Sequence, residues 1–361
     1  MRSSQIRDML CDEESRCYYD LYVRDFLYGN FDNPNNPVKY ELVANALRYA
    51  MDKAKPDDTN DNEYSVVQCI NDYKSRYKKL YIWPASQYAC FISKLLLIYG
   101  VETEAFIDRD PDKVGQSIAG CPVITPDEYQ EQCADTGLLI GGLGSYFSIW
   151  NDIHEMRLRE KGCILYDIDR LYEKQYFGPS FMQPIPNEVF LDVGCAGYTI
   201  PGFVEFAKGD YQRIIGFEAI THHYNQVVET TREYRNVDIY NFAAWSSNAS
   251  IDFLIGAHEM AVTSATRIGS EIRTIKAVRI DDIVKEKVTL VKMDIEGAEL
   301  EALKGAAGII SKYRPRMAIS IYHNERDIID IPRFICSQVA DYSLYIRHHS
   351  AFPWETVLYA I

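Results

Sequence analysis

The sequence FLDVGCAGYTIPGF, residues 190–203, joins an apolar run to a helix-like stretch through a turn that contains two glycines. The apolar run predicts a buried strand ending at Asp192, and Gly194 and Gly197 bracket the turn. Glycines allow the backbone to come close to a ligand, and the start of the next helix supplies free N–H groups. The segment therefore predicts a ligand-binding loop at the carboxyl end of a parallel strand.

Strand-like and helix-like segments alternate after this loop. YQRIIGFE, ITHHYNQVVETTREYR and NVDIYNFAA predict strand, helix and strand, and KVTLVKMD, AELEALKGAAGIISKY and RPRMAISIYH repeat this order. Two closing strands, YSLYIRHH and ETVLYAI, indicate an antiparallel pair at the end. The predicted fold class is α/β, with a doubly wound, mostly parallel Rossmann-like sheet that has helices on both faces.

The chain divides into four predicted parts. Residues 1–78 predict a helical N-terminal region with polar loops, which includes the periodic stretch YELVANALRYAMDKA. Residues 79–150 predict a smaller Rossmann-like domain, because KLYIWPAS, QYACFISKLLLIYG and VETEAFIDRD form a strand, helix and strand pattern. Residues 151–186 are interpreted as a linker, and residues 187–361 as the main α/β domain.

Composition limits the class of protein and its partners. The 361 residues are 47% hydrophobic, which supports sizeable cores, and 38 basic against 52 acidic residues give a net charge of −14. Such a charge argues against a nucleic-acid-binding surface. Nine cysteines without a CxxC pair are typical of reduced thiols in a cytoplasmic protein. No signal peptide and no membrane span are expected, because the longest apolar run is broken by Ser93 and Lys94.

The strand after the glycine loop ends with Glu218, and an acid at this position commonly binds ribose hydroxyls. Two features favour S-adenosylmethionine over a dinucleotide. The turn GCAG is shorter than the GxGxxG pattern, and Asp192 would repel a pyrophosphate but suit a cationic amino acid end. A purely structural turn is the alternative, since glycine turns are routine after strands.

Several segments in order resemble the FkbM family of S-adenosylmethionine-dependent methyltransferases. They are FLDVGCAGYT, GFEAITHHYNQV, YNFAAWSSNASIDF, VRIDDIV, VKMDIEGAELEALKGA and YIRHHS followed by ETVLYAI, over about residues 187–361. The resemblance implies methyl transfer to a hydroxyl of a small molecule or carbohydrate, with a sugar as the first candidate. It also implies the residues that contact the cofactor. These are Asp192, Gly194, Cys195, Ala196, Gly197, Glu218, Asn241, Phe242 and Ala243.

Three residues at strand ends are the predicted catalytic groups. Methyl transfer from a sulfonium needs chiefly a positioned acceptor oxygen and a group that takes its proton. Asp294 and Glu296 follow the strand KVTLVKMD in a turn that should face the cofactor, and His323 ends the next strand. The alternative for Asp294 is a helix N-cap, and for His323 a hydrogen-bonded residue at the sheet edge.

Other acids and histidines nearby are interpreted as structural. Glu299 and Glu301 lie in the first turn of the next helix, where their negative charges would interact favourably with the positive end of the helix dipole. Adjacent histidines on a strand point to opposite faces, and those on a helix are expected on a solvated face, so the doublets do not indicate a metal site. A carboxylate cluster with a nearby histidine could hold a hard divalent cation, but without clear ligand spacing no metal is predicted. The histidine doublets are His222 with His223, and His348 with His349.

The smaller domain resembles the nucleotide-binding-like domain found ahead of sugar-modifying transferases, but its first turn lacks glycines. Pro84, Ala85 and Ser86 stand there instead, which impairs phosphate binding by the backbone. Asp108 and Asp110 remain after the second strand. A structural or substrate-shaping role is favoured, and nucleotide binding is the alternative.

The leading hypothesis is a cytoplasmic O-methyltransferase that uses S-adenosylmethionine and a small-molecule or glycan acceptor. A nicotinamide-dependent oxidoreductase also combines a parallel sheet with a glycine turn and is the enzyme alternative. A catalytically silent nucleotide-binding or assembly module is the second alternative. The sequence leaves the acceptor and a homo-oligomeric state open.

Overall fold

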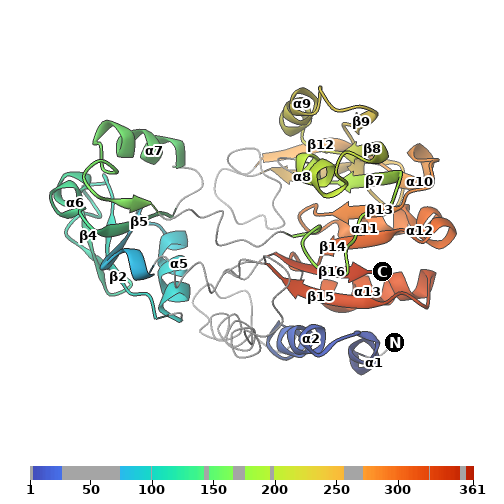
Figure 1. Ribbon diagram of the computed structural model, residues 1–361, viewed down its shortest axis with the longest axis horizontal. Helices are drawn as coiled ribbons and strands as arrows, with labels where there is room; N and C mark the ends of the chain where they lie inside the picture. Colours follow the sequence, from blue (N-terminus) through green and yellow to red (C-terminus); the bar gives the residue numbers. More distant parts are fainter. Residues whose placement is uncertain are drawn as a thin grey trace. The chain divides into compact units, whose positions relative to one another are not determined.

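The computed structural model describes nine stretches of the chain, which divide into two compact units (Figure 1). The stretches are residues 3–26, 74–98, 100–141, 146–165, 175–195, 199–255, 271–324, 326–349 and 355–361. The larger unit is built from the described parts of 1–30, 174–349 and 354–361. The smaller unit is built from those of 31–173.

A seven-stranded sheet forms the larger unit, in the order β15-β16-β14-β13-β7-β8-β9. The first five strands along the chain run parallel, whereas β16 is antiparallel to β14 and to β15. The predicted mostly parallel sheet with an antiparallel pair at its end is therefore confirmed. The strands are β7 Glu188–Val193, β8 Tyr211–Phe217, β9 Val237–Tyr240, β13 Leu290–Met293, β14 Arg316–Ser320, β15 Leu344–His348 and β16 Thr356–Ala360.

Strand β7 is the centre of this sheet, and all six of its residues are buried. A strand covered on both faces is expected to be a nearly continuous apolar run, as EVFLDV is. The strand order reverses at β7, since β8 pairs on one side and β13 on the other. Ligands of doubly wound sheets bind at the carboxyl ends of strands at such a reversal.

Helices cover the sheet, and an aromatic core fills the space against one of its faces. Phe190 of β7 and Phe203 of α8 stack with ring centroids 4.2 Å apart, and Phe177 packs against both rings. The helices are α8 Thr199–Phe206, α9 Thr221–Thr230, α10 Ile280–Ile283, α11 Glu299–Gly305, α12 Ala307–Tyr313 and α13 Asp327–Gln338.

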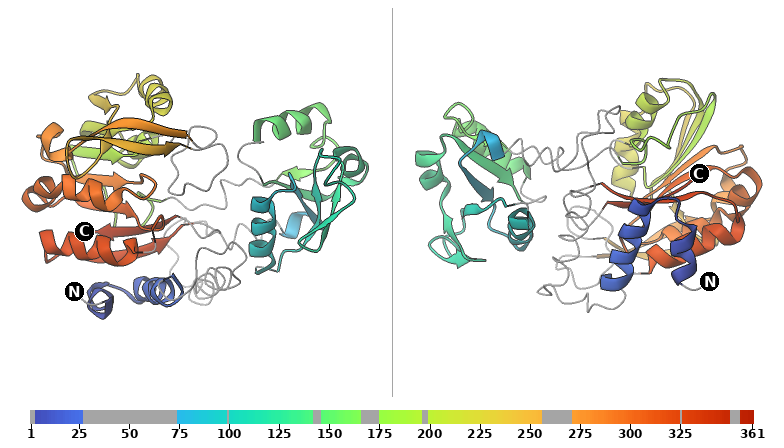
Figure 2. Two further views of the ribbon diagram at one scale, coloured as in Figure 1. Left: turned by 180° about the vertical axis from the view of Figure 1, so that it is seen from behind. Right: turned by 60° about the horizontal axis from the view of Figure 1, so that its bottom comes forward.

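The first two helices of the chain, α1 Ser3–Met9 and α2 Glu13–Phe26, pack on this larger unit beside β15 and α13 (Figure 2). The Cys11 N–H donates to the carbonyl of Leu344 at 2.9 Å, and Arg347 forms an ion pair with Asp12 at 2.6 Å. Residues 1–78 were predicted as a separate region. The structure joins these helices to the sheet instead, because the edge strand β15 has backbone groups that need covering. The predicted helix YELVANALRYAMDKA lies outside the described residues.

The smaller unit contains a six-stranded sheet in the order β3-β4-β2-β1-β5-β6, and its predicted strand, helix and strand are confirmed. The unit extends beyond residue 150, because Ile149, Ile153 and Leu158 are buried in its core. Residues 151–165 thus belong to this unit and not to a linker. Its elements are β1 Lys79–Trp83, α5 Gln87–Ile98, β2 Thr103–Ile107, β3 Ser117–Ile118, β4 Cys121–Ile124, α6 Pro126–Gln132, β5 Thr136–Ile140, α7 Tyr146–Glu155 and β6 Ile164–Leu165.

A second small sheet in the larger unit was not predicted. Its strands β10 Ala243–Ala244, β12 Glu271–Val278 and β11 Ala249–Ile255 lie in that order, with β11 antiparallel to β12. The chain leaves β9 and enters this sheet beside the carboxyl ends of β7 to β9. Within the described stretches, every helix is too short or too polar to cross a membrane.

Candidate active site

A cavity of about 190 Å³ opens at the carboxyl ends of adjacent strands in the larger unit. Residues that follow β7, β8, β9 and β13 all line it, although they come from four separate parts of the sequence. The lining includes six of the predicted site residues. These are Gly194, Glu218, Phe242, Ala243, Asp294 and Glu296.

Gly194 lies where the turn after β7 crosses the turn after β13. Its φ is +79°, and a Cβ placed on it would lie 1.9 Å from the carbonyl oxygen of Asp294. The Asp294 N–H donates to the carbonyl of Val193 at 3.0 Å, which ties the two turns together. Only glycine fits this crossing. The next predicted loop residues, Ala196 and Gly197, lie outside the described residues.

Cys195 is buried behind the loop and does not line the cavity. Its side chain packs against β8, since a Cβ placed on Gly216 would lie 2.9 Å from the Cys195 sulfur. Burial raises the pKa of the Cys195 thiol well above its usual range. A neutral, enclosed thiol of this kind is inert, so Cys195 supports the loop by packing.

Asp192 also lies below the loop and pairs with a lysine that the sequence analysis missed. Lys292 of β13 is buried, and its Nζ lies 3.2 Å from an Asp192 carboxylate oxygen and 2.5 Å from the Gly194 carbonyl oxygen. Burial raises the pKa of Asp192 to about 6, although Lys292 opposes this. Burial would lower the pKa of Lys292, but Asp192 and Asp294 raise it overall. The two groups form an ion pair that positions the loop from beneath.

Glu218 lines the cavity from the end of β8 and is almost entirely enclosed by protein. One carboxylate oxygen accepts the Ile220 N–H at 2.8 Å, which fixes the side chain in place. Asn241 supports the same turn, because its side-chain amide donates to the Glu218 carbonyl at 2.9 Å. Phe242 forms the neighbouring wall, with Lys276 4.5 Å above its ring.

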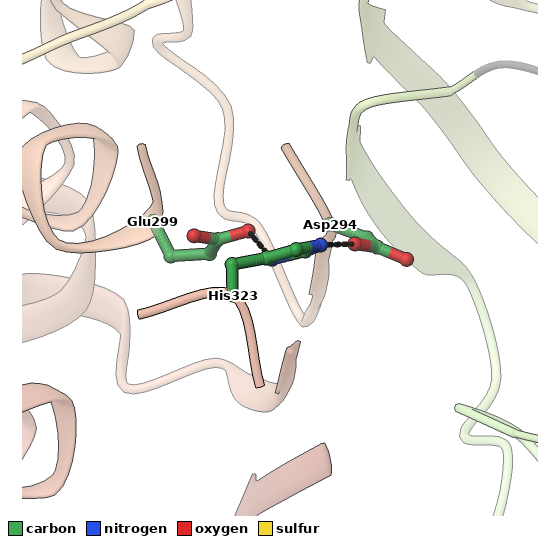
Figure 3. Close-up of side chains that lie close together, drawn as sticks. All are labelled: Asp294, Glu299 and His323. Atoms are coloured by element: carbon green, nitrogen blue, oxygen red, sulfur yellow. Dashed lines mark hydrogen bonds and ion pairs between the residues drawn. The ribbon is translucent and has the colours of Figure 1, made fainter. Parts of the chain in front are cut away.

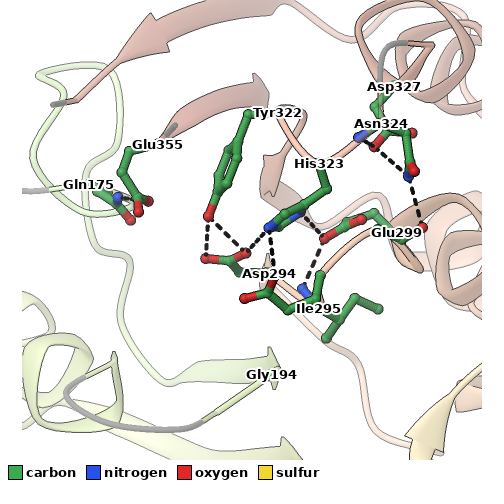
Figure 4. A network of polar contacts seen from close by, with 12 residues as sticks. Gln175, Gly194, Asp294, Ile295, Glu299, Tyr322, His323, Asn324, Asp327 and Glu355 are labelled. Carbon is green, nitrogen blue, oxygen red and sulfur yellow. Dashed lines mark hydrogen bonds and ion pairs between the residues drawn. The ribbon is translucent and has the colours of Figure 1, made fainter. Parts of the chain in front are cut away.

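Asp294 is the centre of a polar network at one side of the cavity (Figure 4). The Tyr176 hydroxyl donates to its Oδ2 at 2.7 Å, and the Tyr322 hydroxyl lies 3.3 Å from Oδ1. Tyr176 comes from the segment before β7, so it was not associated with the site in the sequence. Two phenol donors hold the carboxylate in one orientation.

The His323 ring lies between two carboxylates, those of Glu299 and Asp294 (Figure 3). Its Nδ1 is 2.9 Å from Glu299 Oε1, and its Nε2 is 3.5 Å from Asp294 Oδ1 and 3.7 Å from Glu296 Oε2. Burial would lower the pKa of His323, but the bond to Glu299 and the surrounding negative charges raise it to about 9. The ring is therefore cationic at neutral pH when only protein groups surround it.

Glu299 lies in the first turn of α11, as interpreted, but its side chain also contacts His323. Its side chain is fully buried, and one oxygen accepts the Ile295 N–H and contacts His323, both at 2.9 Å. The spacing held a usable signal, because Glu299 precedes the buried Ala302 and Leu303 by three and four residues and so shares their face. Glu301 is on the outer face, where it pairs with Lys304 at 2.5 Å.

The histidine doublets lie apart from this cluster. His349 is buried against Tyr359, with Nε2 2.7 Å from the phenol oxygen, and burial lowers its pKa to about 3. His348 contacts Thr356 at 2.9 Å. His222 is exposed on α9, as expected, but His223 lines the cavity from that helix.

In the smaller unit, Asp108 contacts its own chain. It is buried, accepts the Ala85 N–H at 3.1 Å and pairs with Lys113 at 2.9 Å. The Asp110 N–H also donates to it at 3.0 Å. The turn that would bind phosphate in a related domain is thus braced by the carboxylate of Asp108.

A family model matches part of the larger unit. Residues 202–344 match the family described as the methyltransferase FkbM domain. No curated protein matches the chain. Three solved structures are similar to this chain over part or most of its length. Methyltransferase FkbM from Methylobacillus flagellatus KT is 18% identical, covers 91% of this chain and 100% of its own, and has a TM-score of 0.48. An rRNA methylase from Streptococcus thermophilus is 11% identical, and the match covers 48% of this chain and 85% of the methylase, with a TM-score of 0.30. Aeropyrum pernix fibrillarin, solved with S-adenosyl-L-methionine, is 14% identical. The match covers 49% of this chain and 67% of the fibrillarin chain, with a TM-score of 0.28.

Proposed function

We propose that this chain, which carries a methyltransferase domain of the FkbM family at residues 202–344, methylates a hydroxyl of a small molecule or carbohydrate. The methyl donor is S-adenosylmethionine. The observation that carries the proposal is the cavity itself, where the glycine turn after β7, the acid after β8 and the acids after β13 meet. No single stretch of the chain supplies all three.

Each part of the cofactor would have a partner among the lining residues. The loop at Gly194 would bind the amino acid end, since its backbone can approach closely. Glu218 would accept hydrogen bonds from the ribose hydroxyls, as acids at the end of the second strand commonly do. Phe242 and Ala243 would flank the adenine. Among the described residues that line the cavity there is no lysine or arginine that could neutralise a pyrophosphate, although Lys276 lies over the Phe242 ring, and this favours the sulfonium cofactor over NAD.

The acceptor would enter beside Asp294 and Glu296. In the transfer, the acceptor oxygen forms a bond to the methyl carbon as the carbon–sulfur bond breaks, and S-adenosylhomocysteine leaves uncharged. The hydroxyl proton passes to a carboxylate of this turn, Asp294 or Glu296. Catalysis then consists of positioning the oxygen in line and accepting its proton.

Binding of S-adenosylhomocysteine tests the cofactor. At a concentration 100 times its Kd, it should stabilise the protein by about 2.7 kcal/mol, whereas NAD should have no effect. Glu218→Gln should weaken the binding about tenfold, because one charge-assisted hydrogen bond to the ribose is lost. The readout is the thermal unfolding midpoint, with calorimetry for affinity. Glu229→Gln is the matched control, since Glu229 pairs only with Arg232 on the exposed face of α9. Stabilisation by NAD and not by S-adenosylhomocysteine would make the protein an oxidoreductase.

The acceptor class is tested by incubating the protein with radiolabelled S-adenosylmethionine and host carbohydrate extracts. We expect label in a sugar-containing product. If hydroxylated acceptors of every class stay unlabelled although the cofactor binds, the chain is a silent binding module.

We place the protein in the cytoplasm, because all seven cysteines in the described stretches are free thiols.

Glu296 is expected to lower the stability of the fold, because its backbone conformation is strained, while its side chain serves the proposed reaction. It is not a glycine, yet its φ is +57°, and Gly297 follows with φ +101°. Glu296→Gly should raise the free energy of unfolding by about 1 kcal/mol, because the left-handed conformation strains a residue with a Cβ. Methyl transfer should fall, because an acid beside the acceptor is lost.

Lys208→Gly is the control for this variant. Lys208 has φ +51° and is also followed by a left-handed glycine, Gly209, but it lies outside the cavity. It should gain similar stability in urea unfolding and keep full transfer activity. Equal activity in the two variants would remove Glu296 from the site.

A further inference from the structure

The imidazole of His323 is held in one orientation with its second nitrogen facing the acids of the β13 turn. Glu299 is fully buried and lies 2.9 Å from Nδ1, so that nitrogen carries the hydrogen and donates it. The His323 side chain is only 7% exposed. Among the described groups, its Nε2 has no hydrogen-bond partner. A buried nitrogen without a partner is costly unless a ligand completes it.

The distances from Nε2 to two carboxylate oxygens suit atoms that bind the same metal ion. Nε2 lies 3.5 Å from Asp294 Oδ1 and 3.7 Å from Glu296 Oε2, which is too long for good hydrogen bonds. Two atoms bound to the same cation at about 2.0 to 2.3 Å lie roughly 2.8 to 3.3 Å apart at octahedral angles and roughly 3.3 to 3.8 Å apart at tetrahedral angles. Both measured separations fall in the tetrahedral range.

The charges around the ring also favour a cation. Three carboxylates, from Asp294, Glu296 and Glu299, surround one imidazole within 3.7 Å. Asp294, Glu299 and His323 each present a ligand atom within 4.8 Å of the others (Figure 3). A metal ion bound to Nε2 would replace the proton that this atom otherwise carries.

The surrounding residues resemble the outer shell of a metal site. A metal-binding histidine commonly donates its other N–H to a carboxylate, as His323 does to Glu299. Metal-binding carboxylates are in turn held by hydrogen bonds, and Asp294 accepts one from the Tyr176 hydroxyl and one from the Tyr322 hydroxyl. Figure 4 shows the contact with Tyr322. Glu299 is thus a positioning residue that acts through His323.

We propose that Asp294, Glu296 and Nε2 of His323 bind one divalent metal ion. Carboxylates suit Mn²⁺ and an imidazole suits Zn²⁺, so the mixed set admits either ion, and Mn²⁺ is chosen as the probe because it can be detected directly. An open coordination position would hold an oxygen of the acceptor, whose proton would pass to a carboxylate oxygen of this turn that does not bind the ion. This second part rests on the proposed methyltransferase function. The acceptor class would then be a molecule with two neighbouring oxygens, such as a vicinal diol, that can chelate the ion.

Binding of Mn²⁺ to the full chain tests the site without cofactor or acceptor. Electron paramagnetic resonance, which detects free Mn²⁺, should show one ion bound per chain. His323→Gln and Glu296→Gln should each weaken the Kd about 100-fold, and Glu299→Gln about 10- to 100-fold. Glu301→Gln should have no effect, since Glu301 lies on the same helix turn but pairs with Lys304.

The variant Glu296→Gln keeps this test decisive. Its side chain is 43% exposed, so the substitution should not disturb folding even if His323→Gln does. Equal Mn²⁺ affinity in Glu296→Gln and wild type, or no binding in wild type at millimolar Mn²⁺, would overturn the site. If S-adenosylhomocysteine binds but Mn²⁺ does not, the metal site fails and the proposed function stands. If Mn²⁺ binds but S-adenosylhomocysteine does not, the metal site stands and the proposed function fails.

Discussion

Gly194→Ala is expected to lower the free energy of unfolding by about 3 kcal/mol or more and to abolish binding of S-adenosylhomocysteine. An alanine Cβ would lie 1.9 Å from the Asp294 carbonyl oxygen, where no side chain can move aside because the obstacle is backbone. Either the turn after β7 or the turn after β13 must shift. Both line the cavity, so the same displacement should disturb the loop that we propose for the cofactor and the acids that we propose for the acceptor.

Gly209→Ala separates this overlap from simple backbone strain. Gly209 has φ +74°, close to the +79° of Gly194, but nothing lies within 4 Å of a Cβ placed there. The free energy of unfolding of Gly209→Ala should fall by only about 1 kcal/mol, which is the cost of the left-handed conformation, and this variant should bind the cofactor normally. Urea unfolding and calorimetry provide the two readouts. Equal losses in the two alanine variants would show that the turns do not need to cross so closely.

Lys292→Met is expected to destabilise the protein by about 3 to 5 kcal/mol, because it leaves the carboxylate of Asp192 buried without its cation. Asp192 is 0% exposed, so water cannot replace the lost Nζ. The Gly194 carbonyl also loses its donor, which should weaken cofactor binding. Both effects can be measured by urea unfolding with and without S-adenosylhomocysteine.

The double variant Asp192→Asn with Lys292→Met should recover much of the stability, since it removes the stranded charge together with its partner. Lys304→Met is the surface control. Its Nζ lies 2.5 Å from Glu301, but both groups are partly exposed, so the loss should be below about 1 kcal/mol. If the double variant were as unstable as Lys292→Met alone, the ion pair would not explain the loss.

Much of the α/β architecture was predictable because local patterns report local structure. The apolar run EVFLDV matched β7, and the alternation after it produced the parallel sheet with an antiparallel end. The small sheet of β10, β11 and β12 was missed, since its strands are short or half exposed and lack a buried run. The first two helices showed no sequence sign that they cover β15, because that contact joins residues more than 300 positions apart.

The position of a residue after a strand was enough to bring Gly194, Glu218, Asp294 and Glu296 to one cavity, because parallel strands end at the same edge of a sheet. The sequence by itself determined this much: the sheet, its ligand-binding edge and the acids there. Only the tertiary structure decided which acids are partnered. Lys292 neutralises Asp192 and Glu299 orients His323, because burial in a folded interior makes each charge depend on the groups packed against it.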